Sequence, residues 1–393
     1  MRGLKLSVLA LGICLAAALI VVSVDPTFWR RRLTLPMKHI VTATDWYSPR
    51  VVVAGAAGPA LVGAAPSERL IAATALDAAL DYGKAHPTVA LLVFHAGRIE
   101  LEYYGRGYSA NSLTDSQSMH KSVLALLYGI ALQDGFLHSV EEPLGRFIPE
   151  WSGDPRGAIH LRSLLQMTSG LAQARMSLNP FSSGLQLFLS SDRRPKLLQT
   201  QSVRPADVEF DYNPINSELL GVALEHATGR SYAEYLSQRL WQPLGASPAY
   251  LWADHEGGLV HTACCLQATA RDWLRLGMLV MNRGAVDGRQ IVPAAWVDEM
   301  LSSSQRNPNY GYQIWLGRQF TPQRRYTVAS SMRAHHSEPF LAPDVAYFDG
   351  AGGQRVYVVP SARLVIVHTG DATLDWDDAF LVNTLLRGIA AKH

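Results

Sequence analysis

The sequence predicts an α/β protein of the α+β type, with one antiparallel sheet completed from both ends of the chain. Two observations support this prediction. A helix and a short hairpin precede a long helix-rich middle, and strand patterns joined by tight turns return only from about residue 309 onward, before a last helix. Strands of one sheet must pair with each other, so the middle is expected to be a helical insert between them.

Composition places the chain among globular proteins. It has 393 residues, of which 48% are hydrophobic and 17% charged, enough for a substantial core. The net charge of +2 argues against a nucleic-acid partner. Three cysteines are too few for a disulfide framework, and we expect no bridge between the adjacent Cys264 and Cys265.

The first 24 residues predict export. A short basic region is followed by "LSVLALGICLAAALIVVSV", which carries no charge, and no convincing cleavage site follows Ile20. An uncleaved signal anchor is favoured over a cleaved signal peptide, and a buried core helix is the remaining alternative. The protein is therefore expected in the periplasm or attached to the membrane on its periplasmic face.

Residues 25–66 are interpreted as a connecting arm that becomes flexible at "VVVAGAAGPALVGAAP", and residues 67–393 as one domain. Ser67 is a plausible N-cap for a helix over 67–86. The segment 88–105 predicts a hairpin that turns at "HAGR". A helical subdomain is expected over about 122–270.

The later elements follow from periodicity and from glycine and proline signals. Helices are predicted at 160–171, 216–245 with a break at Gly229, 268–284, 293–304 and 375–391, and strands at 309–317, 345–360 and 362–371.

The helix that begins within "SQSMHKSVLALLYGIALQDG" is apolar from Val123 onward, yet Ser118 and Lys121 share one face of its first turn. A serine at a helix N-terminus lies among unpaired backbone N–H groups. Desolvation lowers the pKa of a lysine, which can then relay the proton of the serine hydroxyl. The pair therefore suggests an activated nucleophile. The alternative is a solvated lysine at a frayed helix start, because the spacing alone is weakly specific.

The wider sequence resembles the serine β-lactamase and penicillin-recognising hydrolase superfamily, especially its class C β-lactamase, family VIII esterase and 6-aminohexanoate-dimer hydrolase branch. The matching segments, in order, are "SMHKSVLALLYGIALQDG", "HLRSLLQMTSGL", "FDYNPINSELLGVALEHATG", "YLSQRLWQPLGA", "ATARDWLRLGMLVMNRG" and "GAGGQRVYVVPSARLVIVHTGD". The resemblance implies a β-lactamase/DD-peptidase-like fold, with the active site between the helical and α/β parts, and implies no metal or organic cofactor.

The resemblance also implies a catalytic tyrosine in a Tyr-x-Asn turn, which aligns with Tyr212. Here Pro214 stands at the asparagine position. A phenol near an ammonium is stabilised as phenolate, so Tyr212 and Lys121 could share the role of general base. A tyrosine packed in a surface loop is the alternative.

The third element of such enzymes aligns with "FDGAGGQ", and no lysine stands there. The N–H groups of Ser118 and Ala351 are expected to form the oxyanion hole. Gly350, Gly352, Asn216 and His120 are expected to line the substrate pocket. His368 lies in an "HTG" after the strand "RLVIV", whereas the family's third element comes before the hairpin that turns at "VVPSARL". His368 is therefore assigned a structural role. The other histidines lack metal-ligand spacing.

The sequence therefore predicts a serine hydrolase that cleaves a small ester or amide through an acyl-enzyme on Ser118. The loop "LAQARMSL" lacks the tyrosine that the amide-cleaving relatives add, which favours esters. A β-lactamase or DD-peptidase is the alternative on the same fold. A non-catalytic, membrane-anchored binding protein is the alternative of another class. The sequence does not predict the oligomeric state.

Overall fold

A computed structural model describes residues 22–327, 332–373 and 375–392. The predicted signal anchor or signal peptide, residues 1–24, falls almost entirely outside this part of the chain. Within the described residues, no helix has the length and apolar character needed to cross a bilayer.

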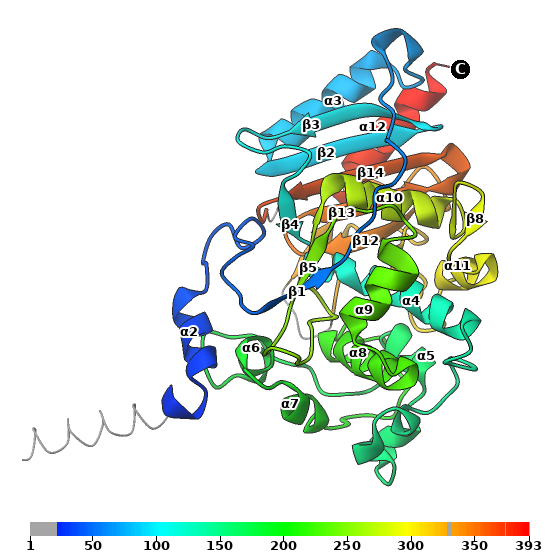
Figure 1. Ribbon diagram of the computed structural model, residues 1–393. Coiled ribbons are helices and arrows are strands. Elements are labelled where there is room, and N and C mark those ends of the chain that lie inside the picture. Colours follow the sequence, from blue (N-terminus) through cyan, green and yellow to red (C-terminus); the bar gives the residue numbers. More distant parts are fainter. Residues whose placement is uncertain (1–21, 328–331, 374, 393) are drawn as a thin grey trace, which may run out of the picture.

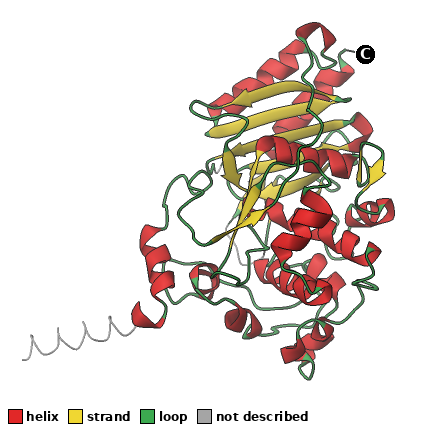
Figure 2. Cartoon of the chain, in the orientation of Figure 1, coloured by secondary structure: helices red, strands yellow, loops and turns green. Residues whose placement is uncertain are grey.

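The main sheet has six strands in the order β3-β2-β14-β13-β12-β9, and every neighbouring pair is antiparallel. Figures 1 and 2 show it in the upper half of the molecule. Its early and late strands meet where β2 pairs with β14, which confirms the sheet completed from both chain ends. The strands are β2 Thr88–His95, β3 Arg98–Tyr104, β9 Trp315–Leu316, β12 Ala346–Gly350, β13 Gln354–Val359 and β14 Leu364–Gly370.

Side chains that alternate along the strands form two cores, one on each face of the sheet. Leu91 and Val93 pack under α3 (Ala73–Ala85) and α12 (Asp378–Ala390). Leu92 and Val365 pack on the opposite face, against α4 (His120–Gln133) and α10 (Ala270–Met281). A strand period of two therefore explains why both faces are covered by helices.

The helical insert lies below the sheet in Figure 1. The predicted break at Gly229 is confirmed, because Gly229 ends α8 in the left-handed region, with φ of 63°. The predicted helix at 160–171 is shorter. The insert contains α5 Leu161–Leu165, α6 Ser183–Leu189, α7 Arg194–Leu198, α8 Pro214–Thr228 and α9 Tyr232–Leu236.

A second sheet, which the sequence patterns did not predict, joins the insert to the N-terminal arm. Its strand order is β1-β5-β6-β4, with β1 Arg50–Val53, β4 Leu113–Asp115, β5 Ala249–Trp252 and β6 Leu266–Thr269. The remaining α-helices and β-strands are α2 Pro26–Thr34, α11 Ala294–Met300, β7 Ala285–Val286, β8 Arg289–Gln290, β10 Gln323–Arg325 and β11 Arg333–His335.

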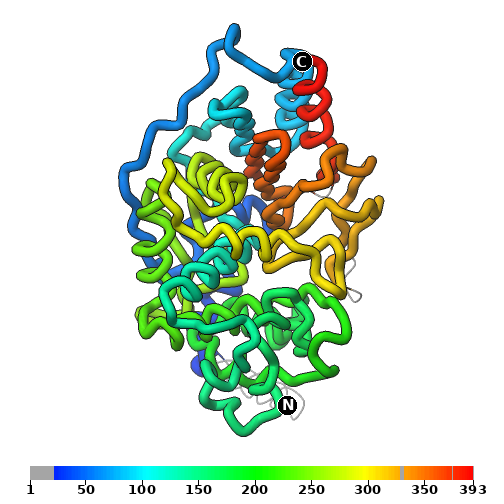
Figure 3. The backbone as a smooth tube through the Cα atoms, turned by 90° about the vertical axis from the view of Figure 1, so that its right-hand side faces the viewer, coloured from blue at the N-terminus to red at the C-terminus, as the bar shows by residue number. Residues whose placement is uncertain are grey.

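The arm is folded onto the domain, so the expectation of a flexible connection over 51–66 was wrong. Strand β1 pairs with β5, and the N–H of Ile99 donates to the carbonyl of Val62. Figure 3 shows the chain after β1 following the outside of the molecule up to α3. Backbone pairing with two sheets compensates for the small, weakly apolar side chains of this segment.

Arg31 of α2 fixes the start of the arm. Its side chain is only 1% exposed and donates hydrogen bonds to five backbone carbonyls from three segments of the chain. These carbonyls belong to Ser48, Leu189, Ser190, Ala253 and Asp254. Only a guanidinium offers enough planar donors for such a set.

We therefore expect Arg31→Lys to lower the free energy of unfolding by about 3 kcal/mol, because buried carbonyls lose their donors. The exposed neighbour offers a matched control, and Arg30→Lys should change stability by less than about 0.5 kcal/mol. Denaturant unfolding measures both. Equal stability of the two variants would contradict the anchoring role.

Candidate active site

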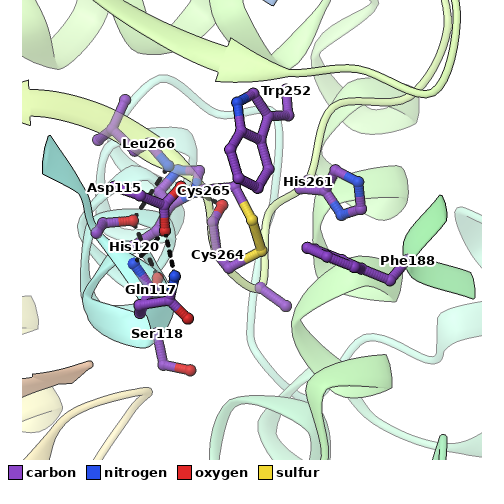
Figure 4. Close-up of a disulfide and its surroundings, with 12 residues drawn as sticks. Asp115, Gln117, Ser118, His120, Phe188, Trp252, His261, Cys264, Cys265 and Leu266 are labelled. Atoms are coloured by element: carbon purple, nitrogen blue, oxygen red, sulfur yellow. Dashed lines mark hydrogen bonds between the residues drawn. A yellow bond between two sulfur atoms is a disulfide. The ribbon is translucent and has the colours of Figure 1, made fainter. Parts of the chain in front are cut away.

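Ser118 and Lys121 lie at the start of the central helix α4. A short 3-10 turn, Gln117–Met119, leads directly into α4, and Figure 4 shows Ser118 at this tip. The ammonium group of Lys121 donates to the Ser118 Oγ at 2.8 Å. Lys121 is 2% exposed, whereas Ser118 remains partly exposed. The lysine is therefore not solvated at a frayed helix end, and the serine hydroxyl remains accessible.

The surroundings of Lys121 favour its neutral form. Its Nζ also donates to the Ala263 carbonyl at 2.5 Å. Burial lowers the pKa of Lys121 to about 7, although the charges of Glu218 and Asp349 oppose this shift. A lysine with this pKa can exchange a proton with a neighbouring hydroxyl at neutral pH.

Tyr212 closes the group of three. The Lys121 Nζ lies 5.1 Å from the centroid of the Tyr212 ring, and a hydrogen bond links the side chains of Tyr212 and Ser118. The structure therefore brings together the three residues that the sequence predicted. Tyr212 is partly exposed and does not lie in a separate surface loop.

The phenolate interpretation of Tyr212 is not supported. Burial, followed by the charge of Asp349, raises the pKa of Tyr212 well above its usual range, and the hydrogen bond to Ser118 only partly offsets this. A neutral Lys121 provides little positive charge to stabilise a phenolate. The phenol is therefore a proton donor at neutral pH, and Lys121 is the better candidate base.

The departure at Pro214 has a local explanation. Pro214 occupies the first position of α8, where a missing N–H costs nothing. Asn213 caps this helix by accepting from the N–H of Ile215 at 3.1 Å. Its amide donates to the carbonyls of Leu171 and Ala172. The turn that holds Tyr212 is therefore ordered without an asparagine at position 214.

Gln173 was missed by the sequence analysis. Its amide nitrogen donates to the Tyr212 carbonyl at 3.0 Å and to the Asp211 carboxylate at 2.7 Å. It comes from the same loop, "LAQARMSL", that lacks the expected tyrosine. Gln173 holds the backbone of Tyr212, while Trp315 and Tyr326 pack against the ring. The hydrogen-bond partners of Gln173 lie 38 and 39 residues away in the sequence, so no local sequence pattern could have identified it.

The end of β12 lies beside Ser118. A Cβ on Gly350 would come within 2.6 Å of the Ser116 carbonyl, so only glycine fits this approach. Ala351 follows directly and is exposed, and Gly352 turns the chain with φ of 79°. This placement is compatible with a pocket wall at 350–352. The oxyanion role of Ala351 remains a prediction.

Two expected pocket residues are buried and serve the framework instead. His120 is 0% exposed and bridges the Cys264 carbonyl and the Tyr232 hydroxyl, at 2.8 and 2.9 Å. Burial lowers its pKa to about 4, so its ring is neutral. Asn216 is also 0% exposed and accepts from the Ser169 hydroxyl at 2.5 Å. Helix α8 turns the Asn216 side chain away from solvent, so both residues hold the framework around the site.

His368 has the expected structural role. It is buried within β14, its ring contacts the Gly353 carbonyl and the Thr88 hydroxyl, and it stacks on Trp376 with 4.0 Å between ring centroids.

The expectation that Cys264 and Cys265 would not bridge was wrong. They form a disulfide in the loop before β6, 3.7 Å apart at their Cα atoms. His261 lies close enough to form a possible metal-ligand group with them, but the two sulfurs are bonded to each other and offer no thiolate.

A cavity of about 330 Å³ has Tyr326 in its wall, and none of the three candidate catalytic residues is among those that line it. Tyr326 packs against Tyr212, with 5.5 Å between their ring centroids. Aromatic and charged side chains share its wall. The lining residues are Val208, Glu209, Phe210, Arg306, Asn307, Arg325, Tyr326 and Thr327.

Residues 74–371 match the profile of the family described as Beta-lactamase. The chain belongs to this family. It is 25% identical, over 235 residues, to the 6-aminohexanoate-dimer hydrolase of Paenarthrobacter ureafaciens, covering 56% of this chain and 58% of the relative. The chain thus matches less than two thirds of that relative's length. The family match over residues 74–371 confirms the resemblance seen in the sequence.

Solved structures of low sequence identity share the fold of this Beta-lactamase-family protein. A proposed 6-aminohexanoate-dimer hydrolase from Bacillus anthracis has a TM-score of 0.66 at 19% identity, over 89% of this chain and 90% of that one. A family VIII carboxylesterase has a TM-score of 0.59 at 14% identity, over 81% and 98%. A D-alanine carboxypeptidase from Burkholderia cenocepacia has a TM-score of 0.55 at 18% identity, over 81% and 98%.

The low pKa of Lys121 predicts an effect on stability. Between pH 7 and 10 the unfolded lysine binds a proton that the folded one has lost, so this group destabilises the fold near pH 7 and the penalty fades as pH rises. We expect Lys121→Met to raise the free energy of unfolding at pH 7.5 by about 1–3 kcal/mol, and by less at pH 10.

Denaturant unfolding at both pH values tests this expectation. Lys84→Met, on the exposed side of α3, is the matched control and should change little at either pH. A Lys121→Met variant that is clearly less stable at pH 7.5 would show that the buried ammonium group stabilises the fold.

Proposed function

We propose that this protein hydrolyses an ester or amide bond of a small molecule through an acyl-enzyme on Ser118. One observation carries the proposal. A buried lysine with a pKa of about 7 lies 2.8 Å from the hydroxyl of a partly exposed serine. Such a pair costs stability, and that cost is typical of a site that performs chemistry.

In the first step, neutral Lys121 takes the proton from the Ser118 Oγ as this oxygen attacks the substrate carbonyl. The N–H groups of Ser118 and Ala351 stabilise the developing oxyanion. Tyr212 gives its proton to the leaving group and regains one from protonated Lys121. Water then attacks the acyl-enzyme, and the same groups move the protons in reverse.

The raised pKa of Tyr212 supports the role of proton donor. A phenol that keeps its proton at neutral pH can protonate an amine or alkoxide leaving group as the bond breaks. Its backbone is held by Gln173 and its ring by Trp315 and Tyr326. The donor is thus fixed before the substrate binds, which lowers the entropy cost of the reaction.

Small esters are the favoured substrates, and short amides come next. The 6-aminohexanoate-dimer hydrolase and the family VIII carboxylesterase among the similar proteins are named for these two bond types. β-Lactam or D-alanyl peptide hydrolysis is less favoured, because "FDGAGGQ" offers no lysine for a substrate carboxylate.

We also propose that the protein acts outside the cytoplasm, attached to the membrane or free in the periplasm. The uncharged apolar stretch before residue 24 supports this proposal. A disulfide between Cys264 and Cys265 is compatible with an oxidising compartment.

Ser118→Ala tests the nucleophile. We expect it to abolish covalent labelling by a fluorophosphonate and to lower kcat/KM for p-nitrophenyl acetate by about a thousandfold or more. Ser67→Ala, at an exposed position in the 3-10 turn Pro66–Glu68, is the control and should label like the wild type.

The same labelling assay separates the competing functions. Folded wild-type protein that is neither labelled nor hydrolytic would favour the non-catalytic binding protein. Covalent capture of a labelled penicillin in place of ester turnover would favour the penicillin-recognising alternative.

Tyr212→Phe tests the proton donor. We expect kcat/KM for an anilide or amide to fall by about a hundredfold, because these leaving groups must be protonated. For p-nitrophenyl acetate the loss should stay below about tenfold, since p-nitrophenolate leaves without a proton. Equal losses on both substrates would indicate that Tyr212 only shapes the site.

A further inference from the structure

The disulfide between Cys264 and Cys265 lies in the loop whose backbone bonds to the start of α4. Figure 4 shows it between the tip of α4, where Ser118 lies, and the side chains of His261 and Phe188. Cys265 is 1% exposed and belongs to an aromatic-rich core formed by the arm, α6 and β5, whereas Cys264 remains partly exposed. Cys264 is therefore the more accessible residue of the two.

The backbone around this disulfide is bonded to the catalytic segment at consecutive positions. The Ala263 carbonyl accepts from Lys121 at 2.5 Å, and the Cys264 carbonyl contacts the ring of His120 at 2.8 Å. The N–H of Leu266 donates to the Ser116 Oγ at 3.1 Å, and the N–H of Ser116 donates to the Leu266 carbonyl at 3.0 Å. The orientation of these peptides therefore determines where Lys121 finds its acceptor.

The backbone conformation at the disulfide is unusual. Cys265 has φ of 77°, in the left-handed region that side-chain-bearing residues rarely adopt. A covalent ring that joins two adjacent residues limits the conformations their shared peptide can reach. Without the ring, the two residues have more freedom to leave this conformation and to turn the carbonyls of Ala263 and Cys264.

We propose that Cys264–Cys265 is a redox-modification site, and that its disulfide form holds the Ala263 carbonyl where Lys121 needs it. The reacting partner is a small dithiol or a dithiol protein. The effect on catalysis rests on the proposed function, because it acts through Lys121 on Ser118. Reduction releases the backbone, displaces the acceptor of Lys121 and slows acylation of the serine.

The reaction balances as an ordinary thiol–disulfide exchange. One thiolate of the dithiol attacks the sulfur of Cys264, the more exposed residue, forms a mixed disulfide and releases the Cys265 thiolate, which takes up a proton. The second thiolate of the dithiol then attacks the dithiol's other sulfur, which is bonded to Cys264 in the mixed disulfide. The dithiol closes its own disulfide, and the released Cys264 thiolate takes up a proton. The protein gains two electrons and two protons, and the dithiol becomes a disulfide.

The test compares the oxidised and reduced full-length protein. It is reduced with dithiothreitol under argon, and alkylation followed by mass spectrometry measures reduction at Cys264 and Cys265. The rate of fluorophosphonate labelling is then measured in each state. We expect labelling to be about tenfold slower in the reduced protein, as for a catalytic group displaced by less than 1 Å, and to recover on reoxidation with oxidised glutathione.

Variants separate this site from general reduction effects. The double variant Cys264→Ser/Cys265→Ser should label slowly with or without dithiothreitol. Cys14→Ser, which removes the third cysteine, should respond to reduction like the wild type. If the double variant does not fold, the reversible change in the wild type decides the question.

Two outcomes overturn different claims. Unchanged labelling after complete reduction of both cysteines overturns the redox proposal and leaves the hydrolase intact. Absence of labelling in the oxidised and the reduced protein overturns the proposed function, and with it the catalytic consequence of the disulfide.

Discussion

A buried amine at the first turn of α4 is the constraint on which the site depends. Lys121 has almost no contact with solvent, and it donates to the Ser118 hydroxyl and to the Ala263 carbonyl. Burial removes the hydration energy that stabilises an ammonium group, and neither two hydrogen bonds nor the charges of Glu218 and Asp349 fully replace it. The pKa of Lys121 therefore falls to about 7. The burial that makes the lysine costly to fold is also what makes it a usable base.

The fold holds this amine by bringing three distant segments together. Helix α4 supplies Ser118 and Lys121, the loop before β6 supplies the Ala263 carbonyl, and the start of α8 supplies Tyr212. The unpredicted sheet of β1, β5, β6 and β4 connects the first two, because β4 leads into α4 and pairs with β6. The N-terminal arm adds the edge strand β1, so an apparently peripheral segment supports the sheet that leads to the candidate catalytic residues.

Local sequence patterns predicted most of the fold. Continuous apolar runs mark β2 and β14, helical periodicity and the Gly229 cap mark α8, and the Ser118–Lys121 spacing needs only one helical turn. Each of these signals depends on neighbours within a few residues, so it can be read without the rest of the chain. Placing Tyr212 required the family resemblance, because nothing in its local sequence distinguishes it from any loop tyrosine.

The sequence by itself determined the strands of the main sheet, most of the helices, the family and the serine–lysine pair, since short-range patterns encode each of them. Only the tertiary structure decided that Tyr212 keeps its proton, that His120 and Asn216 are buried, and that Gln173 holds the tyrosine in place. Protonation and exposure depend on the dielectric and the partners around a group. Those are supplied by residues far away in the chain, which meet only when it folds.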